Sequence, residues 1–222
     1  MSDRIPVIAI DGPSGSGKGT VAQQVADALG FHILDSGALY RLVGHSVQQA
    51  GIGFEQPQQA AKIAAEMEVV FDHGRVLLNG EDVSLAIRSE TAGNNASKVA
   101  AMPAVRAALL DWQRDAAKAP GLVADGRDMG TTVFPDAPLK VFLTASAEER
   151  AERRYKQLKE KGIPANLSEL AAEIRERDER DQNRSSSPLI PATDALMIDS
   201  TDLDIDQVVE KVLQAARDVI SG

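Results

Sequence analysis

The sequence predicts an α/β fold, a doubly wound parallel sheet of five strands with helices on both faces, interrupted by a small antiparallel insertion. Three observations support this prediction. A short apolar segment rich in β-branched residues, Ile5–Ile10, runs into a glycine-rich stretch followed by apolar residues at helical spacing. Four more short apolar segments alternate with helical patterns, as in parallel sheets. Between residues 68 and 83 the pattern changes to that of hairpins.

The elements of the first half have recognisable start and stop signals. Gly30 and Gly51 each follow a helical pattern, and glycine is favoured just past helix ends. His73-Gly74 and Asn79-Gly80 have the composition of hairpin turns. The elements expected are a strand at 5–10, a helix ending at 29, a strand at 31–34, helices at 38–49 and 58–67, and short strands at 68–72, 75–78 and 82–83.

The second half returns to the alternation of strands and helices. Ser146 and Ser168 stand where helix N-caps are expected. The elements expected are helix 103–117, strands 122–124 and 140–143, helices 146–161 and 168–181, strand 195–198 and helix 204–220. Parallel sheets of this kind bind ligands at the carboxyl ends of their strands, and polar runs such as Asp125–Asp128 follow these strands directly.

Composition argues against several classes of protein. The chain has no cysteine, so disulfides and thiolate metal sites are ruled out, and its three histidines are scattered. No apolar run approaches the ~20 residues that span a bilayer, and the first residues lack a signal-peptide pattern, so we expect a cytoplasmic protein without membrane contact. The formal net charge of −9 argues against nucleic acid as a partner. Nothing in the sequence demands more than a monomer.

The glycine-rich stretch has the pattern of a phosphate-binding loop. Glycines let successive backbone N–H groups turn toward an anion, and the helix start adds the positive end of its dipole. Lys18 can reach the β- and γ-phosphates of a nucleotide, but Gly19 stands where a hydroxyl usually follows, so Thr20 supplies the hydroxyl. A plain glycine turn is the alternative, which the strand before and the helix after disfavour. The loop residues are Gly12, Pro13, Ser14, Gly15, Ser16, Gly17, Lys18, Gly19 and Thr20.

Asp125 ends an apolar strand, where proteins with such loops place a carboxylate on magnesium. Capping of the following turn is the structural alternative. Regulatory GTPases need an Asn-Lys-x-Asp run to read guanine, and the chain has none. Motor-type ATPases usually carry a glutamate after the strand-ending aspartate, whereas Gly126 stands here. Transfer to a bound acceptor is therefore favoured over hydrolysis.

Four arginines lie in segments expected to face the cleft: Arg41, Arg106, Arg127 and Arg184. Guanidinium groups bind phosphate through two parallel hydrogen bonds. A neutral acceptor such as a sugar or shikimate would not need several arginines. The acceptor is therefore expected to carry a phosphate itself.

Four motifs stand out along the chain: the loop in the form Gly-x-x-Gly-x-Gly-Lys-Gly-Thr and the segments 35–41 (DSGALYR), 125–134 (DGRDMGTTVF) and 176–184 (ERDERDQNR). Together they resemble the bacterial cytidylate kinases. The resemblance covers essentially the whole chain, including the three-stranded insertion that distinguishes this family from shorter nucleoside monophosphate kinases. The first motif fits any such kinase, whereas the others together are specific.

The resemblance implies a role for each matching residue. The catalytic residues would be Lys18, Arg127, Asp128 and Arg184. The phosphates of ATP would be held by the loop from Gly12 to Thr20, with Arg150, Arg153 and Arg154 of one helix face near ATP. Mg²⁺ would lie near Thr20 and Asp125, directly or through water. CMP would be bound by Ser36, Tyr40, Arg41, Ser97, Arg106, Arg127, Asp128, Arg177, Asp181 and Arg184, of which Ser97, Arg106 and Asp128 would read the cytosine edge.

The implied reaction is transfer of the γ-phosphoryl group of ATP to CMP or dCMP, giving CDP or dCDP and ADP. One kinase domain, 1–222, would contain a core (1–39, 101–154 and 186–222), a nucleoside-monophosphate-binding insertion (40–100) and a helical lid (155–185). Both of the latter parts are expected to move so that water is shut out. The alternatives are a kinase of another nucleoside monophosphate or small metabolite, and a nucleotide-binding regulator without turnover.

Overall fold

The computed structural model describes residues 5–72, 75–160 and 162–220. The chain forms two compact units. Unit 1 consists of Met1–Asp35 and Ala116–Gly222, and unit 2 consists of Ser36–Asp115. Within the described ranges, no helix combines the length and apolar character needed to cross a membrane.

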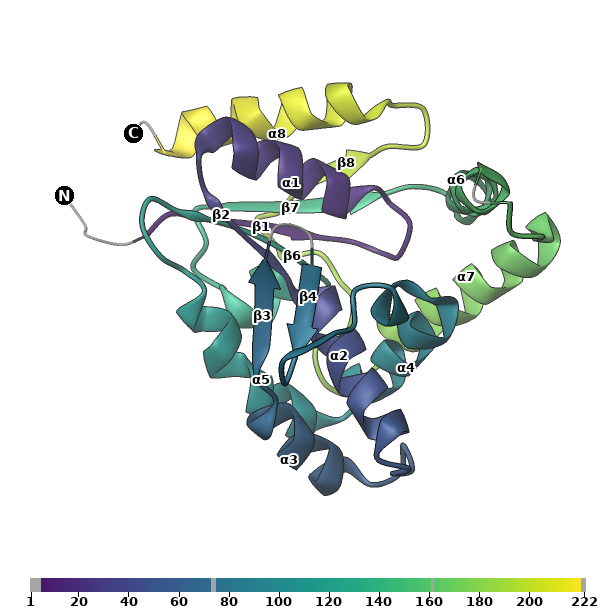
Figure 1. The fold of residues 1–222 in the computed structure, drawn as a ribbon. Coiled ribbons are helices and arrows are strands. Elements are labelled where there is room, and N and C mark those ends of the chain that lie inside the picture. Colours follow the sequence, from purple (N-terminus) through teal and green to yellow (C-terminus); the bar gives the residue numbers. More distant parts are fainter. Residues whose placement is uncertain (1–4, 73–74, 161, 221–222) are drawn as a thin grey trace. The chain divides into compact units, whose positions relative to one another are not determined.

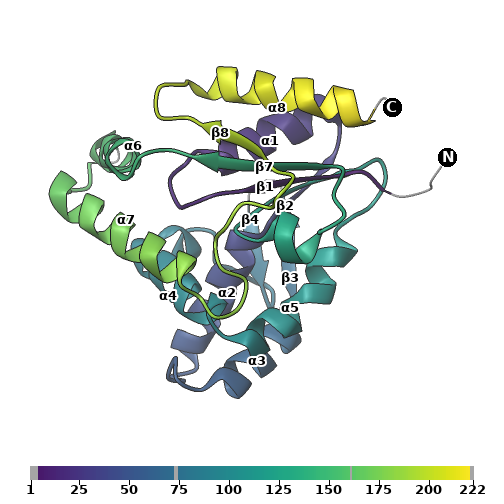
Figure 2. The ribbon, with the colours of Figure 1, turned by 180° about the vertical axis from the view of Figure 1, so that it is seen from behind.

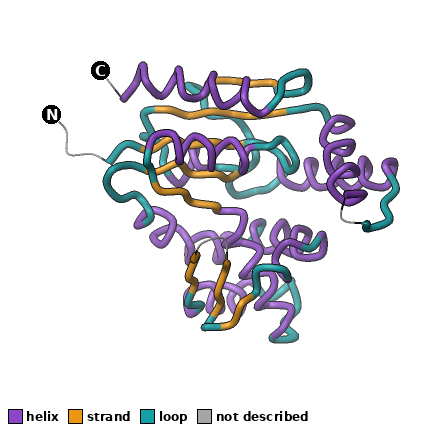
Figure 3. Tube along the Cα trace, turned by 45° about the horizontal axis from the view of Figure 1, so that its top comes forward, coloured by secondary structure: helices purple, strands orange, loops and turns teal. Residues whose placement is uncertain are grey.

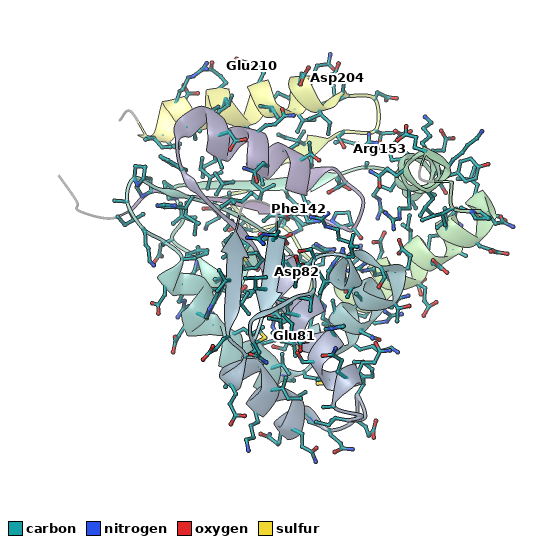
Figure 4. All side chains as sticks on the ribbon, in the orientation of Figure 1. Glu81, Asp82, Phe142, Arg153, Asp204 and Glu210 are labelled. Atoms are coloured by element: carbon teal, nitrogen blue, oxygen red, sulfur yellow. The ribbon has the colours of Figure 1, made fainter. Side chains whose placement is uncertain are left out.

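Unit 1 is built on a parallel sheet of five strands in the order β2-β6-β1-β7-β8 (Figure 1), which confirms the predicted α/β class. The strands are β1 (Val7–Asp11), β2 (His32–Asp35), β6 (Leu122–Gly126), β7 (Leu139–Thr144) and β8 (Leu196–Asp199). The register pairs Asp11 with both Gly126 and Phe142, the latter labelled in Figure 4, and Asp35 with Asp125. The residues that end these strands therefore meet at one edge of the sheet.

Two helices, α1 (Lys18–Leu29) and α8 (Ile205–Ile220), lie side by side over the sheet, as both Figure 1 and Figure 2 show. Their apolar residues recur at helical spacing and face the strands. Val21 and Val25 of α1, Val208 and Val212 of α8, and Ile8 of β1 belong to one buried core. Burying each such side chain contributes about 1.5–3 kcal/mol, so this core holds the glycine loop at the sheet edge.

The helices α6 (Ala147–Glu160) and α7 (Leu167–Gln182) pack on each other through a small cluster of their own, with Ala151, Leu158, Leu170 and Ala171 buried in it. Ser146 caps α6 as predicted, its Oγ accepting from the N–H of Glu149 at 3.1 Å. The cap of α7 is Asn166 and not Ser168, because the Asn166 Oδ1 accepts from the N–H of Ser168 at 3.0 Å. The predicted end of α6 at Lys161 lies outside the described residues.

Unit 2 is mainly helical, with a short antiparallel sheet in the order β3-β4-β5 (Figure 3). Its elements are α2 (Ser36–Gln49), α3 (Pro57–Glu66), β3 (Val69–Asp72), β4 (Arg75–Leu78), β5 (Glu81–Asp82), α4 (Glu90–Ala100) and α5 (Pro103–Asp115). Asn79 and Gly80 form the predicted turn before β5, with φ angles of 49° and 85°. The predicted turn at His73-Gly74 lies outside the described residues.

The sequence did not predict α4. Its buried residues are mostly small or polar, including Ala92, Asn95 and Ala96, so its hydrophobic signal is weak. A cap signal was present, since Ser89 accepts from the N–H of Ala92 at 3.1 Å. Gly44 of α2 lets the two helices approach closely, because a Cβ there would lie 2.9 Å from the Asn95 Cβ.

Candidate functional site

The glycine loop joins β1 to α1, as the sequence predicts. Gly12 and Gly17 have φ angles of 156° and 88°, which side chains with a Cβ rarely adopt. A Cβ on Gly12 would also lie 2.0 Å from the backbone oxygen of Leu143 in β7. The loop is therefore packed against the sheet edge, and its backbone conformation depends on glycine.

Lys18 is the first residue of α1 and is buried, although it is positioned to meet an anion. Its Nζ donates to the Pro13 carbonyl oxygen at 3.0 Å and lies 4.0 Å from the Asp125 Oδ1. Burial and, after it, the charge of Arg127 lower the pKa of Lys18 to about 7, against the opposing effect of the Asp125 carboxylate. A bound polyphosphate would restore the positive charge.

Asp125 and Thr20 provide oxygen atoms of the kind that Mg²⁺ prefers. The Asp125 carboxylate lies against the loop, since a Cβ on Gly19 would be 3.2 Å from its Oδ2. Thr20 is exposed one residue later. Within the described ranges no group of three or more His, Cys, Asp or Glu side chains could hold a metal ion. A carboxylate and a hydroxyl have the chemistry of magnesium ligands, and the remaining ligands would have to come from bound phosphates and water.

Asp11 is a buried carboxylate that the motif alone does not single out. Its two oxygens accept from the N–H groups of Met129 and Gly130, both at 2.8 Å. Burial raises the pKa of Asp11 to about 7, and these two hydrogen bonds oppose the shift. Asp11 thus ties the start of the loop to the segment carrying Arg127 and Asp128. The sequence signal was an aspartate ending an otherwise apolar strand.

Asp181 brings together two arginines predicted to bind the CMP phosphate. Its Oδ2 lies 3.3 Å from the Arg127 Nε, and its Oδ1 lies 3.1 Å from the Arg184 Nη2. The Asp181 and Arg184 side chains are only 4% and 3% exposed. Arg177 lies one turn earlier on α7, and Asp128 is buried just after Arg127. Two guanidinium groups therefore converge on one carboxylate.

The three arginines predicted near ATP have different surroundings. Arg150 reaches the loop, where its Nη1 donates to the Ser14 carbonyl oxygen at 3.0 Å. Arg153, labelled in Figure 4, donates from Nη2 to the Ser200 carbonyl oxygen at 2.6 Å. Arg154 donates to Gln157 of its own helix at 3.3 Å. Arg150 therefore contacts the phosphate-binding loop through its hydrogen bond to Ser14.

Unit 2 carries the other residues predicted for CMP, and several have structural partners. The Arg106 guanidinium lies 5.5 Å from the Tyr40 ring centre, and its Nη1 donates to the Ala100 carbonyl oxygen at 3.2 Å. Arg41 donates to the Ile87 carbonyl oxygen at 3.0 Å. Ser97 is buried on α4. Unit 2 thus brings Tyr40 and Arg106 together.

The predicted residue Ser36 has a partner that the sequence did not single out. Ser36 donates to the buried Gln113 Oε1 at 2.6 Å. The available signal was a glutamine at helical spacing from Leu109 on the buried face of α5. Gln113 therefore holds the Ser36 hydroxyl at the start of α2.

The loop between β1 and α1, the carboxylate at the end of β6 and the arginines of α6 and α7 define a phosphotransferase of the phosphate-binding-loop class. The family model described as cytidylate kinase matches residues 8–218. The chain belongs to the cytidylate kinase family.

Relatives that carry the name cytidylate kinase align along nearly the whole chain. The protein from Colwellia psychrerythraea is 56% identical over 221 residues, covering 97% of this chain and 98% of the relative. The protein from Cupriavidus necator is 58% identical over 210 residues, covering 95% of each chain. A solved structure of an uncharacterized protein from Eubacterium ventriosum has a similar fold, with a TM-score of 0.50 at 12% identity, covering 94% of this chain and 96% of that one.

Proposed function

We propose that the chain transfers the γ-phosphoryl group of ATP to CMP or dCMP, forming CDP or dCDP and ADP. The observation that carries this proposal is membership of the cytidylate kinase family over residues 8–218. The arginines that converge on Asp181 support a phosphate-bearing acceptor.

ATP is proposed to bind with its phosphates at the loop from Gly12 to Thr20. Lys18 and the loop N–H groups would hold the β- and γ-phosphates, and Arg150 would meet them from α6. Arg153 and Arg154 are proposed to contribute charge near the nucleotide. The short distance between Arg150 and the carbonyl of Ser14 supports the first of these arginine assignments.

Magnesium is proposed to bind near Thr20 and Asp125, directly or through water. When bound, it would neutralise charge on the β- and γ-phosphates. Asp125 would hold it at the loop, and Lys18 would supply the neighbouring positive charge. The contact of Asp125 with Gly19 supports this assignment.

CMP is proposed to be bound by the residues that the family resemblance assigns to it. In unit 1, Arg127 and Arg184 would hold its phosphate, Arg177 and Asp181 its sugar, and Asp128 the cytosine amino group. In unit 2, the proposed residues are Ser36, Tyr40, Arg41, Ser97 and Arg106. Asp181 supports the phosphate assignment because it already holds Arg127 and Arg184 in place.

The reaction needs no general base of unusual pKa. An oxygen of the CMP phosphate attacks the γ-phosphorus in line. The bond between the γ-phosphorus and the bridging oxygen breaks, and ADP leaves with that oxygen. Lys18, Arg127 and Arg184 would stabilise the charge on the transferring group, while the loop orients it. The insertion at 40–100 and the lid at 155–185 are proposed to move over the substrates, and the enzyme is proposed to be a cytoplasmic monomer.

The direct test is an assay of ADP release with ATP and a panel of acceptors: CMP, dCMP, UMP, AMP and shikimate. We expect turnover with CMP and dCMP well above that with the other acceptors. Faster turnover with AMP or shikimate would assign a different acceptor. Tight ATP binding without ADP release on any acceptor would indicate a regulator instead.

A further inference from the structure

Arg150 is engaged by a carboxylate from the neighbouring helix. Its Nη1 donates to the Asp178 Oδ1 at 3.1 Å, and its Nη2 donates to the Asp178 Oδ2, forming a two-bonded fork. The two side chains are only 4% and 17% exposed. This pair joins α6 to α7 beside the phosphate-binding loop.

Few donors remain on the Arg150 guanidinium. A guanidinium has five N–H groups. The Nε group donates to the Ala145 carbonyl oxygen at 2.9 Å, and Nη1 also donates to the Ser14 carbonyl oxygen at 3.0 Å. Together with the fork, these bonds use the single N–H of Nε, both of Nη1 and one of Nη2. While the bonds to Ala145 and Ser14 remain, a phosphate can be bound by two parallel N–H groups of Arg150 only if Asp178 leaves.

Arg150 cannot avoid this competition by turning elsewhere. The start of its side chain lies against the loop, since a Cβ on Gly15 would be 3.3 Å from the Arg150 Cβ. The bonds to Ser14 and Ala145 hold the Arg150 guanidinium at the loop, while Asp178 accepts its two parallel hydrogen bonds. Carboxylate and phosphate are both anions that accept two parallel hydrogen bonds from a guanidinium, so an incoming phosphate would take the place of the Asp178 carboxylate.

We propose that Asp178 is a further residue of the donor-nucleotide site, one that lowers nucleotide affinity by occupying Arg150 until the phosphates of ATP displace it. The proposal rests on the proposed role of Arg150 in binding ATP. Nucleotide binding then exchanges one anionic partner of Arg150 for another and frees α7 from α6 at this contact. The apparent nucleotide affinity is the intrinsic affinity multiplied by the fraction of molecules in which Asp178 does not hold Arg150.

The test is the dissociation constant of the β,γ-imido analogue of ATP with magnesium, measured by calorimetry without CMP. Asp178→Asn keeps the shape of the side chain and removes its charge, so the fork weakens. We expect this dissociation constant to fall about tenfold, as for a competing state that holds about nine molecules in ten. Unchanged or weaker binding by Asp178→Asn would overturn the proposal, because Asp178 would then have no effect on nucleotide affinity or would increase it.

Two controls separate competition for Arg150 from a general charge effect. Glu176→Gln removes the same charge from the same helix at an exposed residue that accepts from Arg180 at 2.8 Å, and should change affinity less than twofold. In an Arg150→Ala background, Asp178→Asn should give no gain. An equal gain in either control overturns the proposal.

The ADP-release assay of the wild-type protein separates this inference from the proposed function. If CMP is phosphorylated and Asp178→Asn shows no gain in affinity, only the role of Asp178 fails. If the gain depends on Arg150 but no CMP is phosphorylated, the role of Asp178 in nucleotide binding holds and the proposed acceptor fails.

Discussion

Lys18 lies where burial disfavours its charge, next to a loop built to receive anions. A lysine whose pKa is lowered to about 7 is partly neutral at pH 7.5, and bound phosphates raise its pKa again. Binding of nucleotide should therefore take up protons near pH 8 and take up almost none near pH 5.5, where Lys18 is already charged.

Calorimetric titration with magnesium ADP in buffers of different ionisation enthalpy measures this proton uptake. Lys18→Met is the control, since the substituted residue has no titrating group. The same uptake by the Lys18→Met protein would show that another group is responsible.

Arg127 pairs with Asp181 in this structure and is also proposed to bind the phosphate of CMP. Its Nε lies 3.3 Å from Asp181, and its side chain is 17% exposed. Arg127→Ala should cost about 2–5 kcal/mol in transition-state stabilisation, because a charge-assisted contact to phosphate is lost. The measurement is kcat/KM for CMP, with Arg175→Ala as a matched surface arginine that pairs with Glu148. Less than a tenfold loss in Arg127→Ala would remove Arg127 from the site.

At the scale of single elements, the strands and the loop between β1 and α1 were predictable because their signals are local. β-branched runs, glycine spacing and turn pairs each act within a few residues. The helix α4 escaped prediction because Ala, Asn and Gly give it little hydrophobic contrast. The cap of α7 was misplaced by two residues because Asn166 and Ser168 are both good caps.

The site was predictable in part for the same physical reason. The loop and Lys18 follow from adjacent residues, and the strand-ending Asp125 follows from the chain order. The roles of Asp11 and Asp178 depend on hydrogen bonds to residues 118 and 28 positions away, which no local pattern reveals. Asp11 is buried and the Asp178 side chain is only 17% exposed, and this low exposure, visible only in the fold, distinguishes them from surface aspartates.

The loop between β1 and α1 leaves no room for a side chain at its first glycine. Gly12→Ala should lower the free energy of unfolding by about 3 kcal/mol or more, because its Cβ would lie 2.0 Å from a backbone oxygen. Gly30→Ala is the control, with a φ of 66° but no heavy atom within 4 Å of the added Cβ, and should cost only about 1–2 kcal/mol. Urea unfolding measures the free energy of unfolding of both variants. Equal losses would show that backbone strain at positive φ, and not the close contact, sets the cost.

For the whole enzyme, choice of acceptor should depend on the base. Asp128 would accept from the amino group of cytosine but face a carbonyl oxygen in uracil, and Arg106 would meet an N–H in uracil. Each mismatch should cost about 1–3 kcal/mol, so CMP should exceed UMP by about two to four orders of magnitude in kcat/KM.

Asp128→Ala should narrow this gap mainly by impairing use of CMP. The specificity constants of the wild-type and variant enzymes for CMP and UMP measure the effect. Use of UMP within threefold of CMP by the wild-type enzyme would show that Asp128 and Arg106 do not read the base.

The strand order has a consequence for synthesis on the ribosome. β1 pairs with β6 and β7, β2 pairs with β6, and β8 pairs with β7, so none of these described pairs can form before Leu122 has emerged. Unit 2, at Ser36–Asp115, is continuous and complete earlier. The nascent chain therefore carries the apolar strand β1 without its strand partners until Leu122 has emerged, and such segments are what chaperones bind during translation.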